Sequence, residues 1–382
     1  MSKHPQVTIG LLLSNEGTYR CLGQSSLAGA RHAIADVNRF GGYGFELRAL
    51  EFDPRGQPER YREGAAHLLD SGVRHIFGTT TSASRKDLIP DLQQNHAFLW
   101  YACSYEGFES SENVAYVGAC PNQALLPLLQ YALTEFGKTA FLIGSNYVWG
   151  WESNRITREA LQMANGEVIG ERYIHLGSTA GIVELVPTLL AAPPSFVLNN
   201  LVGESSYFFL RELDAACARA RLRLPVLSYD LTEAELDEVG PMKALRLFTA
   251  GPYFEESGPA FTRQQRALHG PGRLSHFYAG AYVSIELFAQ AYHACGSDDP
   301  AQMLEYLHQR PIETAIGKIR VCSRNNHSAL PCHIAELDGD RFRIVHSEAH
   351  LIDPDPYLTT TSAQIFQAFA TDAAPRRLRM VK

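Results

Sequence analysis

Hydroxyl, thiol and tyrosine side chains gather at the ends of two apolar segments that lie close together in the sequence. The segments 97–100 (AFLW) and 114–117 (VAYV) are followed by Tyr101, Cys103, Ser104, Tyr105 and Cys120. These side chains donate and accept hydrogen bonds, and few charged residues lie among them. No lysine follows them and no GxGxxG or Walker pattern is present, so they do not predict a phosphate site.

Other predicted strands also end in small, polar or aromatic residues. These ends are 14–17 (SNEG), 78–84 (GTTTSAS), 144–149 (GSNYVW), 199–203 (NNLVG) and 229–230 (YD). In open α/β sheets, ligands bind beyond the carboxyl ends of the strands, where helix N-termini present free N–H groups. Thr80 and Ser82 could hold a carbonyl or carboxylate oxygen there. Only Asp230 and Glu16 could pair with an ammonium, so we expect a small neutral polar ligand.

Structural roles compete with these functional ones. Ser82 is also a good N-cap for the predicted helix 82–94, and that role is about as plausible as ligand binding. Tyr101 could pack in the core, and we expect Arg85 and its neighbour Lys86 to form a solvated face. A nucleophilic Cys103 or Cys120 would need a base and a third, orienting group. No histidine falls in a predicted cleft loop, so we expect the protein not to be an enzyme.

Short apolar segments alternate with amphipathic helical segments along most of the chain. Strands are predicted at 7–13, 45–52, 73–77, 97–100, 114–117, 139–143, 166–173, 195–199 and 225–228, with helices between most of them. This alternation is typical of parallel sheets covered on both faces. It predicts an α/β fold with two doubly wound parallel-sheet lobes and a hinged cleft. Two further helices, 276–294 and 300–309, precede β segments at 317–321, 333–337 and 342–347.

Length and composition narrow the functional classes. A chain of 382 residues is expected to form more than one domain. The net charge of −7 argues against direct nucleic-acid binding, and no window is apolar enough for a membrane span. The seven cysteines and the histidines show no metal-ligand spacing, so we expect no metal and no cofactor. The N-terminal apolar run is short and interrupted, which predicts a cytoplasmic protein, or a periplasmic one if a signal peptide has been removed.

Several sequence blocks, taken in order, carry a resemblance to a known family. The blocks are 81–86 (TSASRK), 105–109 (YEGFE), 121–123 (PNQ), 144–147 (GSNY) with 152–154 (ESN), 232–235 (TEAE), 252–254 (PYF), 325–328 (NNHS) and 353–357 (DPDPY). Together they cover roughly residues 6–360. The chain resembles type I periplasmic binding proteins of the branched-chain amino acid receptor class, and within them the AmiC-like cytoplasmic amide sensors and the urea and short-chain amide receptors.

The resemblance implies a set of ligand-binding residues between the lobes. These are Thr80, Ser82, Tyr101, Cys103, Ser104, Tyr147, Trp149, Val202 and Asp230. Thr80 stands where the family usually has an aromatic residue, Cys103 where the amide sensors have threonine, and Trp149 where they have tyrosine. These departures predict a pocket of changed shape.

The resemblance also implies lobe boundaries and a function. The expected N-terminal lobe comprises 5–119 and 252–322, the C-terminal lobe 120–251 and 323–362, and the tail 363–382. The main hypothesis is a non-catalytic sensor of a small amide or urea-like molecule, a negative regulator of an amidase-type operon that acts through an RNA-binding antiterminator. The alternative is the substrate-binding receptor of an ABC transporter for urea, short-chain amides or a branched-chain amino acid-like ligand. Homo-oligomer formation is left open.

Overall fold

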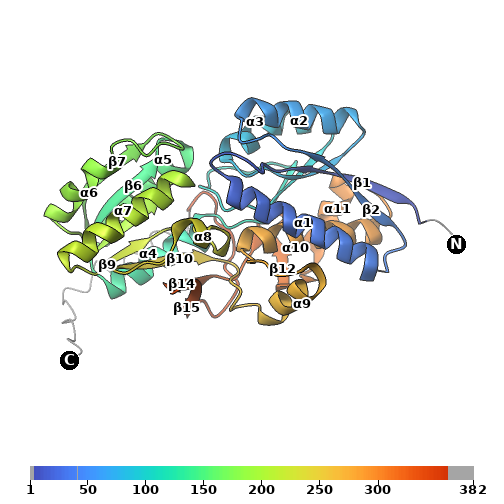
Figure 1. Cartoon of the computed structure of the whole chain (residues 1–382). Coiled ribbons are helices and arrows are strands. Elements are labelled where there is room, and N and C mark those ends of the chain that lie inside the picture. Colours follow the sequence, from blue (N-terminus) through green and yellow to red (C-terminus); the bar gives the residue numbers. More distant parts are fainter. Residues whose placement is uncertain (1–3, 41, 360–382) are drawn as a thin grey trace.

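A five-stranded parallel sheet forms the N-terminal part of the protein (Figure 1). The computed structural model describes residues 4–40 and 42–359. The strand order is β2-β1-β3-β4-β5, which we call the N-terminal sheet. Its strands are β1 (Gln6–Leu12), β2 (Glu46–Phe52), β3 (His75–Gly78), β4 (Phe98–Tyr101) and β5 (Val114–Tyr116). Every residue of β3, β4 and β5 is buried, which agrees with their continuous apolar sequences.

Helices cover both faces of the N-terminal sheet. Helices α1 (Arg20–Phe40) and α10 (His276–Cys295) pack against each other on one face, and α2 (Pro58–Asp70) and α3 (Ser82–Gln94) lie together on the other (Figure 1). Helix α10 is distant in sequence but lies against this sheet. Nearby are α9 (Pro259–His269), α11 (Pro300–Gln309) and a small sheet of β11 (Ile312–Thr314), β12 (Gly317–Val321) and β13 (Ser328–Ala329).

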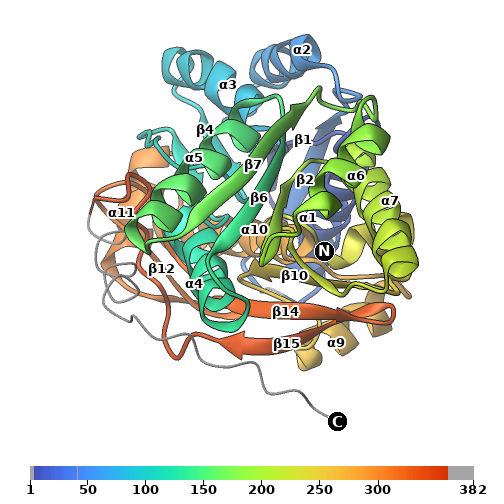
Figure 2. The same cartoon turned by 90° about the vertical axis from the view of Figure 1, so that its left-hand side faces the viewer.

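A seven-stranded sheet forms the other part of the protein, and we call it the C-terminal sheet. Its order is β15-β14-β10-β9-β8-β6-β7, with β14 and β15 antiparallel along one edge (Figure 2). The strands are β6 (Thr139–Ser145), β7 (Glu167–Ile174), β8 (Phe196–Asn200), β9 (Leu224–Leu227), β10 (Leu245–Gly251), β14 (His333–Asp338) and β15 (Arg341–Ser347). The helices are α4 (Leu125–Glu135), α5 (Val148–Met163), α6 (Ile182–Ala191), α7 (Glu204–Ala220) and α8 (Leu236–Val239).

The chain passes between the two sheets more than once. The first passage lies between β5 and α4, the second between β10 and α9, and the third between β13 and β14. Around the third passage, β13 still pairs with β12, and His327 forms a β-bridge with Tyr116 of β5. The lobe boundaries expected from the sequence stay predictions, and the tail at 363–382 lies outside the described residues.

The α/β fold with mainly parallel sheets is confirmed. Strand β10 and helix α9 were not expected. Helix α9 is short and mostly polar, and it buries only Phe261, Thr262 and Gln265. Among the described residues, no helix combines the length and hydropathy that a membrane crossing requires.

The start of β10 is held by one carboxylate, which gives a test of the fold. Asp214 of α7 accepts hydrogen bonds from the backbone N–H groups of Lys243, Ala244 and Leu245 at 2.8–3.1 Å. Its removal leaves three N–H groups without their acceptor. We expect Asp214→Ala to lower the free energy of unfolding in urea by about 2–3 kcal/mol. Glu212→Ala on the same helix is the control, and equal effects in both variants would contradict this role.

Candidate functional site

The loop between β3 and α3 presents hydroxyl groups at the start of a helix. The helix is capped by Thr81, whose Oγ1 accepts a hydrogen bond from the Ser84 N–H at 3.1 Å. The N-cap role weighed as an alternative for Ser82 is therefore wrong, because Ser82 is the first residue of the helix. The loop passes close to β1: a Cβ at Gly78 would lie 2.2 Å from the Leu12 carbonyl oxygen, so only glycine fits.

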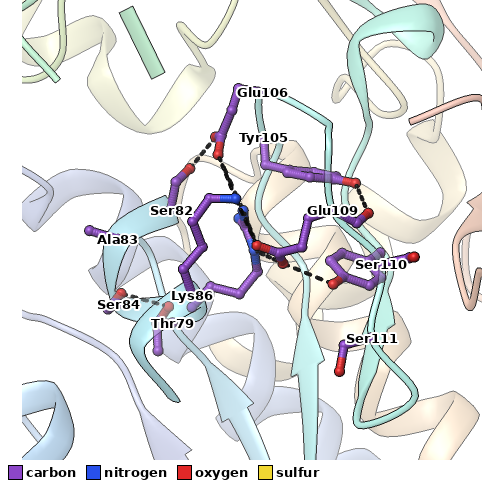
Figure 3. Close-up of polar contacts among 12 residues, drawn as sticks. Thr79, Ser82, Ala83, Ser84, Lys86, Tyr105, Glu106, Glu109, Ser110 and Ser111 are labelled. Atoms are coloured by element: carbon purple, nitrogen blue, oxygen red, sulfur yellow. Dashed lines mark hydrogen bonds and ion pairs between the residues drawn. The ribbon is translucent and has the colours of Figure 1, made fainter. Parts of the chain in front are cut away.

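The two donors at the start of α3 are already paired. The Ser82 hydroxyl donates to a carboxylate oxygen of Glu106, which lies in the loop after β4 (Figure 3). The next N–H, that of Ala83, donates to the Tyr147 hydroxyl at 2.8 Å. Tyr147 precedes α5 and belongs to the other sheet, so this hydrogen bond joins the two halves of the protein.

A cluster of four charged side chains lies behind Ser82. The Arg85 Nε atom lies 2.6 Å from Glu109, and an Nη atom of Arg85 lies 3.3 Å from Glu106. Lys86 lies 2.8 Å from Glu109 and 3.7 Å from Glu106 (Figure 3). The Arg85 side chain is fully buried, so the solvated face expected for Arg85 and Lys86 is wrong for Arg85. Its guanidinium also lies 4.6 Å from the Tyr101 ring centroid.

This cluster makes part of the stability dependent on pH. Burial would raise the pKa of Glu109, but Arg85 and Lys86 outweigh burial and lower the pKa to about 2. A depressed carboxyl pKa stabilises the fold above the unfolded-state value and loses that contribution as the pH falls towards the folded-state value. We expect the free energy of unfolding to fall by on the order of 2–3 kcal/mol between pH 5 and pH 2 through this group.

Glu109→Gln tests this assignment. In the variant, the difference in stability between pH 5 and pH 2, measured by urea titration at each pH, should shrink by about that amount. Glu112→Gln, a carboxyl in the same loop that forms no described ion pair, serves as the control. A variant whose pH profile matches that of the unmodified chain would contradict the role of Glu109.

The remaining expected residues of the N-terminal sheet have internal partners. The Thr80 hydroxyl lies 2.8 Å from the Tyr61 hydroxyl, and the Cys103 thiol donates to the Thr79 carbonyl at 3.2 Å. The Ser104 hydroxyl lies 3.5 Å from Nε2 of His276, the first residue of α10. Burial, followed by the nearby Asp230, raises the pKa of the Cys103 thiol. A protonated thiol is a poor nucleophile, which weighs against covalent catalysis at Cys103.

The C-terminal sheet contributes Trp149, Val202 and Asp230 to one small cavity. Its lining residues are Leu22, Trp149, Asn199, Asn200, Leu201, Val202, Ser206, Ser228, Asp230, Leu231 and Glu235. Leu22 comes from α1, so the cavity lies where α1 meets the ends of β8 and β9. It has room for about one water molecule. Trp149 stacks on Tyr229 with ring centroids 4.6 Å apart, which fixes the indole at the cavity wall.

Three polar atoms of this cavity lining are buried and find no hydrogen-bond partner among residues 4–40 and 42–359. They are Trp149 Nε1, Asn200 Oδ1 and Asp230 Oδ1, one donor and two acceptors. Burial, with a smaller effect of Glu235, raises the pKa of Asp230. Buried polar atoms without partners are costly in proteins. The cavity can therefore receive a small group that accepts from the indole and donates to the two oxygens.

Other contacts bridge the two halves around this site. Arg20 of α1 lies 2.6 Å from Glu238 of α8, and Arg273 lies 3.0 Å from Asp237. The Tyr229 hydroxyl donates to the Tyr105 carbonyl at 3.5 Å. The loops at the carboxyl ends of the two sheets are thus in contact. Trp149, Val202 and Asp230 line the cavity and Tyr147 contacts the start of α3, whereas Thr80, Cys103 and Ser104 are paired within the N-terminal half.

Sequence reasoning missed three important residues of the region. Glu106 lies in the block YEGFE and Asn200 in the strand end NNLVG, but neither was assigned a role. Arg85 was assigned to the surface. The sequence did contain one signal for a buried ion-pair cluster. The basic pair Arg85 and Lys86 lies near a helix start, and Glu106 and Glu109 follow Arg85 by 21 and 24 residues.

One protein-family model matches nearly the whole chain. The sequence model described as a periplasmic binding protein domain matches residues 7–363. Among solved structures, an amino acid ABC transporter substrate-binding protein from Pseudomonas fluorescens is similar, with a TM-score of 0.79 and 16% identity over 94% of this chain and 99% of that one.

Two further structures are similar at comparable levels. An ABC transporter solute binding protein from R. palustris, in complex with 4-hydroxybenzoate, has a TM-score of 0.79 and 16% identity over 93% of this chain and 99% of that one. A leucine binding protein from Thermotoga maritima has a TM-score of 0.77 and 14% identity over 89% and 98%. These identities are low, so the likeness shows a common fold.

Proposed function

This chain belongs to the periplasmic binding protein family, and from that premise we propose that it is a non-catalytic receptor for a small polar molecule. The ligand would bind between the two sheets, at the carboxyl ends of their strands. The observation that supports this most is the cavity with the unpartnered atoms Trp149 Nε1, Asn200 Oδ1 and Asp230 Oδ1. A ligand that fills their hydrogen-bonding capacity would gain affinity there.

We place the protein among the substrate-binding receptors of ABC transporters. This proposal is supported by the similar structures from P. fluorescens and R. palustris, both described as ABC transporter binding proteins. The amide sensor of an amidase operon and its RNA-binding antiterminator partner rest on the sequence resemblance alone, and they stay predictions. The expected cytoplasmic location also gains no support, because the matching family is described as periplasmic.

Lobe closure would couple ligand binding to a signal or to delivery. The proposed moving bodies are the lobes 5–119 with 252–322 and 120–251 with 323–362. The hydrogen bond from Ala83 to Tyr147 and the ion pair between Arg20 and Glu238 join the two halves in the present arrangement. A ligand that contacts both halves favours this arrangement by its differential affinity for it.

Binding to the full chain tests the receptor proposal. Calorimetric titrations with acetamide, urea, leucine and benzoate are combined with native mass spectrometry of the protein as purified. We expect saturable one-to-one binding of at least one probe, or a retained small molecule of defined mass. Absence of both would contradict the receptor function. Binding of amides or urea in preference to leucine would support the amide assignment.

Trp149→Phe tests the role of the cavity. The change removes the indole N–H and keeps an aromatic ring against Tyr229, but the smaller buried ring should lower the free energy of unfolding modestly in a variant that still folds. We expect ligand affinity to fall by about tenfold if the N–H donates to the ligand. Trp151→Phe is the matched control, because its indole is half exposed and donates to Asn146 at 2.9 Å. Equal affinity in both variants would remove Trp149 from the site.

A further inference from the structure

We propose that Glu106 determines the charge of the ligand by excluding carboxylates and other anions from the start of α3. The inference rests on the proposed receptor function and names a specificity-determining residue of that site. Glu106 would act in two ways: it occupies the Ser82 hydroxyl, and it balances the buried charge of Arg85. The ligand that fits such a site carries N–H or O–H donors and no anionic group.

The hydrogen-bond donors at the start of α3 already have acceptors within the protein. A helix N-terminus with a serine in its first turn is well suited to bind an anion, because N–H and O–H groups point at it. Here the Ser82 hydroxyl is committed to Glu106 and the Ala83 N–H to Tyr147. Ser82 and Glu106 both follow strands of the N-terminal sheet. Their hydrogen bond would therefore persist when the lobes open, and an incoming carboxylate would face the Glu106 carboxylate there.

The charges of the four side chains behind Ser82 cancel one another. Arg85 and Lys86 supply two positive charges, and Glu106 and Glu109 supply two negative ones, with each cation within 4 Å of both carboxylates. An additional anion would find no unpaired cation in this cluster. Burying an uncompensated charge is expensive, so an anionic ligand would be strongly disfavoured.

Glu106 neutralises a guanidinium, that of Arg85, which could otherwise bind an anion. The Arg85 side chain is fully buried, and its Nη1 has no hydrogen-bond partner in the part of the chain that the structure describes. Without the charge of Glu106, the cluster would carry one net positive charge, and the neutral amide of glutamine would be a weaker acceptor for the Ser82 hydroxyl than the carboxylate. The Ser82 hydroxyl and the guanidinium could then both donate to a carboxylate, which binds such charge-assisted donors well. Glu106→Gln is thus expected to create an anion site.

The experiment uses pairs of probes with matched shape: acetate with acetamide, and benzoate with benzamide. Calorimetric titrations are made on the full chain, on Glu106→Gln and on Glu109→Gln. The two variants remove the same charge from the same cluster, but only Glu106 contacts Ser82. Thermal melting establishes that each variant is folded before titration.

The unmodified chain should bind neither acetate nor benzoate. Glu106→Gln should gain affinity for at least one of these carboxylates by about tenfold or more, and Glu109→Gln, which leaves the same net charge but keeps the contact with Ser82, should gain clearly less. Equal gains in the two variants would overturn the role of the contact with Ser82. No gain in a folded Glu106→Gln would overturn the inference as a whole.

The unmodified chain provides a separate test, whose outcome does not depend on whether a variant folds. Saturable binding of acetate or benzoate that is at least as tight as that of the matching amide would overturn the inference while leaving the receptor function intact. Failure of every ligand class, together with an empty protein by native mass spectrometry, would instead overturn the proposed function. The two failures are therefore distinguishable.

Discussion

The site depends on one buried charge, the guanidinium of Arg85. Removing such a group from water costs several kcal/mol unless its partners are well placed. Glu106 and Glu109 supply the opposing charges, and the rings of Tyr101 and Tyr105 face the guanidinium with centroids 4.6 and 4.4 Å away. These partners come from the end of β4 and the loop that follows it. The same interaction therefore fixes the start of α3, the loop 105–109 and the wall of the candidate site.

The charge cluster also reaches the third passage between the sheets. The Tyr116 hydroxyl donates to Glu109 at 2.8 Å, and its ring stacks on His327 with centroids 4.0 Å apart. Tyr105 is hydrogen-bonded to the same histidine. Burial lowers the pKa of His327 to about 4, so its imidazole is neutral near pH 7. The charge cluster is thus connected, through adjoining contacts, to the segment that leads into the third passage between the sheets.

The sequence could predict the parallel sheets and the strand ends, because apolar periodicity and loop composition are local properties. Trp149 and Asp230 come four and three residues after the ends of β6 and β9, and both line the cavity, but their role in ligand binding stays a prediction. The Arg85 cluster was not predicted. Arg85 and Lys86 are adjacent charged residues, which suggests an exposed helix face, and only the tertiary contacts with Glu106 and Glu109 bury Arg85. The sequence also could not show that Thr81 and not Ser82 caps α3. Both residue types are favoured at N-caps, and contacts with neighbouring residues decide between them.

The contacts that join the two halves are individually weak, and this bears on how a ligand would act. Arg20 and Glu238 are each more than two-fifths exposed, and Asp237, the partner of Arg273, is 80% exposed. Exposed ion pairs of this kind contribute about 0–1 kcal/mol each. The hydrogen bond from Ala83 to Tyr147 is neutral and adds a similar amount. These polar contacts therefore contribute little by themselves, and a ligand that contacts both halves would add its own differential affinity for this arrangement.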